Sequence, residues 1–328
     1  MNRRTFMGTV AGALVAARSP ARAQQPAKVW RIGILAGAAS GSPGSTVGAV
    51  LKQSLEELGY VEGKNVAYVD RAAGGRIERL PQGAAELVGL GVDVIVTQGS
   101  EATRAAKQAT ASIPIVFVGP SYPVEEGLVA SFARPGGNIT GITLAQSDHV
   151  AKQLQLLRDV VPTLVDVAVI WSPANPGTAF VLRDTESDAG PLRIKVQSVP
   201  IGSADDVEPA LATIARVRPA ALLLLGGVLV NAHVQRFSDL ALKMRVPSIS
   251  NTRALTERGL LLSYGADIRD LQRRVAGYVD RILKGAKPAD LAVERPTKFE
   301  LAVNMKTAKA LGIKIPQALL LRANEVIQ

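Results

Sequence analysis

Short apolar runs alternate with helix-periodic segments along almost the whole chain, and this alternation constrains the fold more than any other feature. The apolar runs predict strands at residues 30–35, 65–69, 92–97, 115–118, 167–171, 194–199, 220–225, 246–249, 260–264 and 299–304. The periodic segments predict helices at residues 47–58, 79–90, 100–110, 154–160, 176–189, 204–217, 234–243 and 269–285. Strands and helices that alternate at this spacing require parallel sheets with right-handed crossovers.

A cluster of chain-breaking residues at 133–138 separates two such series. The chain is therefore predicted to be an α/β protein of two Rossmann-like lobes with parallel sheets, joined by a multi-segment hinge. Lobe I is expected to span residues 28–140 plus about 266–298, and lobe II residues 141–265 plus about 299–328. An aromatic content of 4% and a hydrophobic content of 47% favour this layered α/β class over a β-sandwich.

The amino terminus has the pattern of an export signal. Arg3 and Arg4 are followed by Phe6, a moderately apolar stretch at 8–17, and the small-x-small site that ends at Ala23. This pattern resembles the twin-arginine signal peptide, so residues 1–23 are predicted to be removed after export to the periplasm. The apolar stretch is far shorter than the roughly 20 residues that span a bilayer, and no later run is long enough. The mature chain is thus expected to be a monomer that does not span a membrane.

Composition argues against several functional classes. The net charge is +10, but four of the positive charges fall in residues 1–23, and the other basic residues are scattered instead of forming a nucleic-acid-binding stripe. Cysteine is absent, and His149 and His233 lack companions at metal-ligand spacing. The chain also lacks a nucleophile-elbow motif, a phosphate-binding loop and a dinucleotide fingerprint. We therefore expect no enzymatic activity, no cofactor, no metal and no nucleic-acid partner.

The loops that follow the predicted strands are small or polar, and they define one face of the molecule. Loops at the carboxyl ends of parallel strands are where ligands bind in open α/β sheets, and two facing lobes would form a cleft there. The candidate ligand-binding residues are Ser40, Gln98, Gly99, Ser100, Ser121, Tyr122, Trp171, Asn175, Gly227, Asn251 and Tyr264. Structural roles are equally open for single positions: Ser100 as a helix cap, Trp171 as core, and Gly227 as part of a tight turn.

Five segments carry a family resemblance. Residues 58–66 and 131–141, with 282–288, 296–301 and 306–312, resemble the ABC transporter substrate-binding family that includes tryptophan- and tyrosine-binding proteins. The resemblance runs from about residue 29 to residue 327. It implies a type I periplasmic-binding-protein fold that passes a small-molecule ligand to an ABC permease in the inner membrane. A periplasmic sensor partner of a membrane receptor remains the alternative, because it uses the same closing cleft.

The resemblance is weaker at the positions expected to contact the ligand. Members commonly read Asp-Pro-Val where this chain has Tyr122-Pro123-Val124, and they often carry an acid where Gly226-Gly227 follows a strand. Without these acids, a bound α-amino acid would leave its ammonium poorly paired. We therefore predict an aromatic or aliphatic carboxylate in preference to a free amino acid, with Tyr122, Trp171 and Tyr264 offering surfaces for ring stacking.

Overall fold

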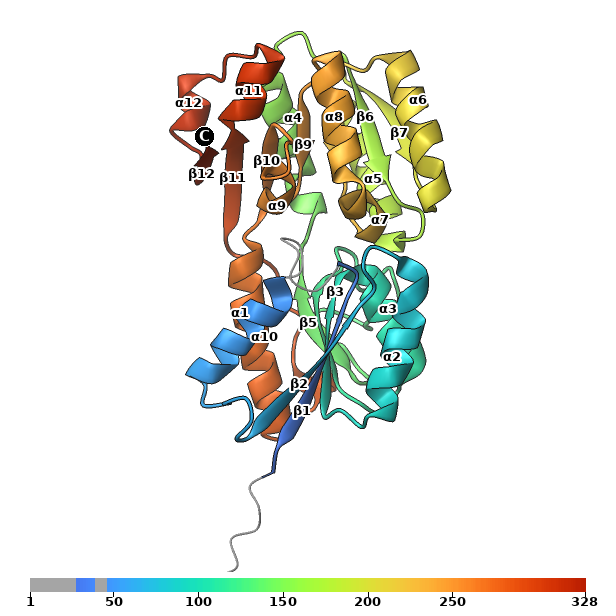
Figure 1. Cartoon of the computed structure of the whole chain (residues 1–328), viewed down its shortest axis with the longest axis vertical. Helices are drawn as coiled ribbons and strands as arrows, with labels where there is room; N and C mark the ends of the chain where they lie inside the picture. The colour runs from blue at the N-terminus through green and yellow to red at the C-terminus, as the bar shows by residue number, and fades with distance from the viewer. Residues whose placement is uncertain (1–27, 39–45) are drawn as a thin grey trace, which may run out of the picture.

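Two β-sheets with helices on both faces lie end to end in the elongated molecule (Figure 1). The computed structural model describes residues 28–38 and 46–328. The first sheet has five parallel strands in the spatial order β2-β1-β3-β4-β5. Their bounds are β1 Trp30–Ala36, β2 Val66–Ala72, β3 Val94–Gln98, β4 Ile115–Gly119 and β5 Ile139–Thr143. The helices of this lobe are α1 Thr46–Glu57, α2 Leu80–Gly89, α3 Gly99–Ala109 and α10 Ile268–Leu283, with 3₁₀ turns Ile77–Arg79 and Pro288–Asp290.

The second sheet has seven strands in the order β12-β11-β10-β9-β8-β6-β7. Their bounds are β6 Asp166–Trp171, β7 Lys195–Pro200, β8 Leu222–Leu224, β9 Ser248–Ser250, β10 Leu262–Ala266, β11 Phe299–Asn304 and β12 Glu325–Ile327. Its helices are α4 Ser147–Val160, α5 Pro176–Ala189, α6 Val207–Val217, α7 Val228–Ala232, α8 Val234–Met244, α9 Arg253–Thr256, α11 Met305–Leu311 and α12 Gln317–Leu320, with a 3₁₀ turn Ala204–Asp206. β11 runs antiparallel to β10, whereas the other pairings in this sheet are parallel.

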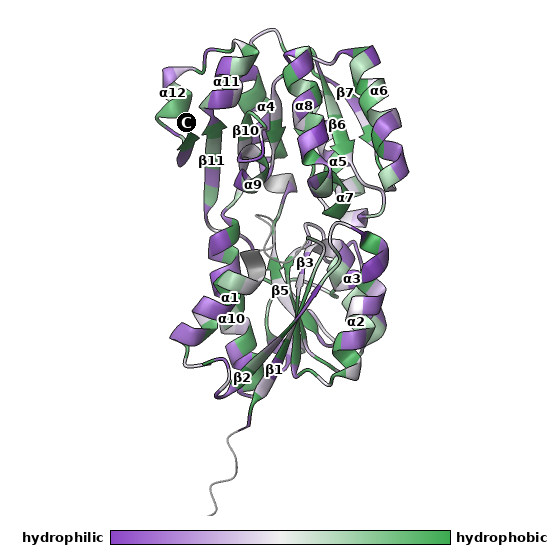
Figure 2. Cartoon of the chain, viewed as in Figure 1, coloured by the Kyte–Doolittle hydropathy of each residue, from purple (hydrophilic) through white to green (hydrophobic). Residues whose placement is uncertain are grey.

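Each sheet has a hydrophobic cluster on both of its faces. In the first lobe, α1 and α10 cover one face of the sheet, and α2 and α3 cover the other. In the second lobe, α4, α5 and α11 pack on one face, and α6 and α8 on the opposite one. Central strands such as β3 and β4 are apolar and buried on both sides, as a doubly covered parallel sheet requires. Apolar residues follow the strands and the inner helix faces, while hydrophilic residues line the outer faces (Figure 2).

The predicted fold class is confirmed, with one strand added to the first sheet. β5 was absent from the sequence prediction, because its five residues contain Gly141 and directly follow the breaker cluster. That glycine is required: its φ is +152°, and a Cβ there would overlap the backbone of Phe117 on the neighbouring strand. The helix expected at 154–160 begins earlier, at Ser147. Only the close pairing with β4 makes the segment recognisable as a strand.

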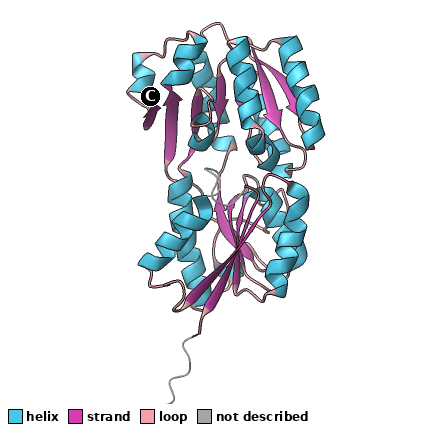
Figure 3. Ribbon diagram, viewed as in Figure 1, coloured by secondary structure: helices cyan, strands magenta, loops and turns pink. Residues whose placement is uncertain are grey.

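The chain passes between the two sheets three times. It crosses after β5, again at Asp267 between β10 and α10, and a third time just before β11 (Figure 3). The second and third crossings run side by side, since the Asp267 backbone N–H donates to the carbonyl of Lys298 at 3.0 Å. Across residues 28–38 and 46–328, none of the helices is both long and apolar enough to cross a membrane.

Candidate functional site

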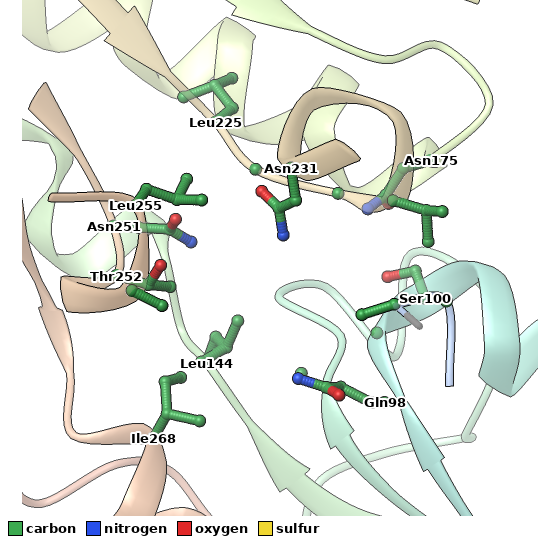
Figure 4. A pocket seen from close by; sticks show the side chains of 18 of the residues that line it. Gln98, Ser100, Leu144, Asn175, Leu225, Asn231, Asn251, Thr252, Leu255 and Ile268 are labelled. Atoms are coloured by element: carbon green, nitrogen blue, oxygen red, sulfur yellow. The ribbon is translucent and has the colours of Figure 1, made fainter. Parts of the chain in front are cut away.

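A cavity of about 550 Å³ lies where the carboxyl ends of the two sheets face each other (Figure 4). Loops from both lobes and the crossing segments form its wall. From the first lobe come Gly37, Ala38, Gly74, Gly75, Gln98, Gly99, Ser100, Glu101, Val118, Gly119 and Ser121. From the second come Asn175, Gly177, Thr178, Leu225, Gly226, Gly227, Val228, Asn231, Ala232, Asn251, Thr252, Arg253, Ala254, Leu255, Glu257, Arg258 and Glu300. Leu144, Gln146, Ile268 and Arg269, at or next to the crossings, complete it.

Most of the candidate residues named from the sequence meet at this cavity. The seven that line it are Gln98, Gly99, Ser100, Ser121, Asn175, Gly227 and Asn251. They come from the ends of five different strands, β3, β4, β6, β8 and β9, so the rule that places ligands at the carboxyl edge of parallel sheets brought together residues far apart in sequence. Ser40 lies outside the described residues.

The three aromatic candidates lie elsewhere, and the structure corrects the expectation that their rings face the cleft. Tyr122 packs against Phe180 with ring centroids 5.2 Å apart, and its hydroxyl donates to Asp184. The indole N–H of Trp171 donates to Ser198 Oγ at 2.8 Å. All three rings pack on the hydrophobic cluster of the second lobe, and none is among the described residues that line the cavity. A strand residue directs its side chain to a face of the sheet and not to its end, which explains Trp171 and Tyr264.

Tyr264 has a ring partner of its own within the second lobe. Its ring stacks on that of Phe299, with centroids 6.2 Å apart and planes 17° from parallel. The two residues are on neighbouring strands, β10 and β11. One face of the ring predicted to stack on a ligand therefore packs against another residue of the chain.

Glu101 is one of the wall residues absent from the candidates named from the sequence. It is the third residue of α3, and its side chain reaches the opposite lobe. One carboxyl oxygen accepts from the backbone N–H of Val228 at 3.1 Å, and the other accepts from Asn175 Nδ2 at 3.3 Å. Burial raises the pKa of this carboxyl above its ordinary value. The only sequence signal was an acid within a loop of small residues that follows a buried strand.

A second acid, Glu126, lies beside Glu101 at the lobe junction. Its Oε1 accepts from Ser100 Oγ at 3.0 Å. Burial raises its pKa to about 7, although the hydrogen bond from Ser100 opposes the shift. A Cβ added to Gly177 of the other lobe would lie 2.5 Å from this same oxygen. The two lobes therefore approach closely here, and a side chain at Gly177 would require the Glu126 carboxyl to move.

Two amide side chains of the cavity wall carry oxygens that have no hydrogen-bond partner among the described residues. Asn231 Oδ1 and Asn251 Oδ1 are buried and accept no hydrogen bond from any described residue. Both surround Gly226, where a Cβ would lie 3.2 Å from Asn251 Oδ1 and 3.8 Å from Asn231 Oδ1. Both side chains point toward the open space in Figure 4. Buried polar atoms nearly always have a partner, so these two amides can hydrogen-bond a solute.

Charged groups gather at the side of the cavity nearest the hinge. Arg253 forms ion pairs with Glu257 at 3.1 Å and with Glu300 at 3.9 Å. Arg258 donates to the backbone carbonyl of Asn231 at 2.7 Å and so supports the segment that carries this amide. Burial raises the pKa of Glu300, and Arg253 opposes this shift. This side of the wall combines cationic and anionic groups.

The amino termini of three long helices also reach the cavity wall. α3 begins at Gly99, directly after β3, and α10 begins at Ile268 after the Asp267 cap. α5 begins at Pro176, and the Asn175 side chain caps it by accepting from the Gly177 N–H at 3.1 Å. Unpaired N–H groups and the helix dipole make such termini favourable neighbours for an anionic group.

Comparison with protein families places the chain in a known family. The family model described as "ABC transporter substrate binding protein" matches residues 44–327, which is most of the chain. The chain belongs to this family. Proteins of this family are substrate-binding components of ABC transporters and not enzymes.

Individual relatives agree with this assignment. The chain is 24% identical over 264 residues to the tyrosine-binding protein of Clostridioides difficile (strain R20291), covering 80% of this chain and 75% of that protein. A conserved domain protein from Vibrio cholerae has a similar structure, with a TM-score of 0.85, 26% identity and coverage of 91% of this chain and all of the other. An ABC domain from Streptococcus pneumonia in complex with L-Trp has a TM-score of 0.83 at 23% identity, covering 92% of this chain and all of the other.

Proposed function

We propose that this substrate-binding protein is the extracytoplasmic solute receptor of an ABC importer and that it encloses one small carboxylate-bearing solute between its lobes. The observation that carries the proposal is the cavity of about 550 Å³ at the facing carboxyl ends of the two sheets. That volume lies within the range of pockets that bury small organic ligands. Family membership supports the transport role.

The wall chemistry favours a solute with an acidic head and an apolar body. The helix amino termini of α3, α5 and α10, together with Arg253 and Arg269, offer favourable surroundings for a carboxylate. The free amides of Asn231 and Asn251 can pair with further polar groups. Apolar wall is supplied by Val118, Leu144, Leu225, Leu255 and Ile268.

The cavity wall contains one acid, Glu101, but both of its carboxyl oxygens accept hydrogen bonds from the second lobe, so we base the proposal on recognition of a carboxylate and not of an ammonium. Two similar proteins are associated in name with tyrosine and with L-Trp. Carboxylate recognition is common to amino acids and to their deaminated analogues, and it is therefore the feature that we propose.

The remaining features of the proposal concern export and movement. We infer that residues 1–23 direct export to the periplasm and are removed near Ala23, and that the mature chain acts as a monomer. The three crossings after β5, at Asp267 and before β11 would form the hinge about which the lobes close. The first lobe then extends to Thr143, because β5 belongs to the first sheet.

Calorimetry with a matched solute panel tests the proposed function. The panel pairs aromatic and branched aliphatic amino acids with the corresponding deaminated acids and with the amides that lack the carboxylate. We expect binding in the micromolar range or tighter for at least one carboxylate and loss of roughly 100-fold or more in affinity for its amide. Binding of neutral amides as tightly as the acids would refute carboxylate recognition. Native mass spectrometry of protein purified without refolding would reveal a co-purified solute.

A further inference from the structure

Glu101 spans the junction between the lobes. It belongs to α3 of the first lobe, and both of its carboxyl oxygens accept hydrogen bonds from the second lobe, from the Val228 N–H at 3.1 Å and Asn175 Nδ2 at 3.3 Å. The residue is 9% exposed. A single side chain thus joins two separate segments of the opposite lobe, the start of α5 and the start of α7.

The two hydrogen-bond donors to Glu101 are fixed in position by contacts within the second lobe. Asn175 Oδ1 accepts from the Gly177 N–H as the cap of α5, so Nδ2 of the same amide faces Glu101. Rotating the amide would lose the cap, which fixes its orientation. The second donor, the Val228 N–H, belongs to the backbone, and its position follows from the chain path after Gly227.

Glycines allow the lobes to come close enough for this contact. A Cβ on Gly227 would lie 3.2 Å from Glu101 Oε1, and a Cβ on Gly37 would overlap Cγ2 of Val228. Gly227 also has a φ of +99°, which disfavours any side chain. Together with Gly177 against Glu126, three glycines of the junction meet groups of the opposite lobe.

We propose that Glu101 is the positioning residue that holds the two lobes closed, so that it sets how long a solute stays bound. The inference rests on the proposed function, because it takes the closed state to be the one that retains the solute. Hydrogen bonds to a carboxylate are stronger than those between neutral groups, and two of them end on one side chain here. Contacts between the lobes that stabilise the closed state slow the dissociation of every solute to the same degree. A direct contact between Glu101 and the solute would change affinity only for solutes that carry the matching group.

Distance measurements between the lobes test the latch directly. The chain has no cysteine, so Ala85→Cys on α2 and Ala212→Cys on α6 provide the only two labelling sites; both positions are exposed and lie in different lobes. The distance between the two labels is measured with and without solute. The measurement is made in the otherwise unchanged chain and in chains that also carry Glu101→Gln, Asn175→Ala or both. Glutamine keeps the size of the side chain and one acceptor oxygen, but it removes the charge and the second acceptor.

We expect Glu101→Gln to lower the ratio of closed to open molecules about tenfold and to raise the dissociation rate of every bound solute by a similar factor. Asn175→Ala should also lower the closed-to-open ratio. The ratio in the double variant should fall by less than the product of the two single fold-changes, because the two residues share one contact. Glu78→Gln, an exposed acid on the same lobe, is the matched control and should change neither quantity. Circular dichroism checks that each variant is folded.

Two results would overturn the latch. One is a closed-to-open ratio in Glu101→Gln within twofold of the unsubstituted protein. The other is a loss of affinity confined to solutes that carry an ammonium, since that would make Glu101 a direct solute contact. If no solute in the panel binds, the proposed function fails by itself. The label distances in solute-free protein then still decide the latch, since equal distributions with and without Glu101→Gln reject it and a more open variant supports it.

Discussion

At the scale of single residues, the partly buried acid Glu126 ties stability to pH. Its folded-state pKa is raised from 4.5 to about 7, so its burial favours the protonated form. The stability that the protonated Glu126 contributes to the folded state is fully present below about pH 4.5 and is lost as the pH rises through about 7. Glu126→Gln, which cannot ionise, should raise the free energy of unfolding near pH 8 by roughly 1–3 kcal/mol and change it little near pH 5. Urea unfolding at both pH values measures this.

The matched control for that experiment is Glu125→Gln. Glu125 is the exposed neighbour of Glu126. Its substitution removes a solvent-exposed carboxylate and leaves the partly buried Glu126 in place. Equal pH profiles for Glu126→Gln and the unsubstituted protein would show that Glu126 titrates normally.

A second prediction at this scale concerns the free amide of Asn251. Its side-chain oxygen has no internal hydrogen bond among the described residues, so Asn251→Ala should leave stability almost unchanged. Loss of a hydrogen bond to the solute should weaken binding by roughly 1–3 kcal/mol, measured by calorimetry. Asn304 is the contrasting case, because its amide donates to the Thr256 carbonyl and accepts from the Thr307 N–H. Asn304→Ala should reduce stability; reduced stability in Asn251→Ala as well would argue against a role in solute binding.

At the scale of elements, the turn after β1 packs directly against the Val228 side chain, which follows the turn after β8, and Gly37 leaves room for that side chain. Gly37→Ala would push a methyl group into Val228 at the start of α7. Each lobe keeps its own core, so we expect near-normal stability but solute affinity reduced by about tenfold or more, because closing the cavity would now cost a steric overlap. Calorimetry and thermal unfolding separate the two effects.

Gly89→Ala is the control for Gly37→Ala. Gly89 is the last residue of α2, and a Cβ there meets nothing within 4 Å. This substitution should be neutral or should stabilise by about 0.4–1 kcal/mol, because alanine restricts the unfolded chain. Unchanged affinity in Gly37→Ala would indicate that the turn moves aside at little cost.

At the scale of the whole molecule, a solute held between two lobes should stabilise both of them together. A solute at 100 times its dissociation constant adds about 2.7 kcal/mol to the free energy of unfolding if it binds only the folded protein. Closure should also reduce the radius of gyration in small-angle scattering. A solute that stabilises the chain without compaction would indicate binding to one lobe alone.

The sequence by itself determined the layered α/β class, the two series of strands and helices, and the sheet edge at which the strand ends meet around a cavity. These follow from local causes: apolar runs bury themselves, and periodic segments form helices that cover them. The same logic correctly brought Gln98, Ser100 and Asn251 to one cavity, because strand ends meet wherever strands are parallel.

Only the tertiary structure decided which side chains enter the cavity and which contacts cross it. Trp171 and Tyr264 turn to a face of the second sheet, where their rings pack on its hydrophobic cluster. Glu101 reaches donors 74 and 127 residues further along the chain, which no local pattern encodes. β5 likewise becomes a strand through its pairing with β4. Local periodicity specifies elements, whereas contacts between distant segments exist only after the lobes have come together.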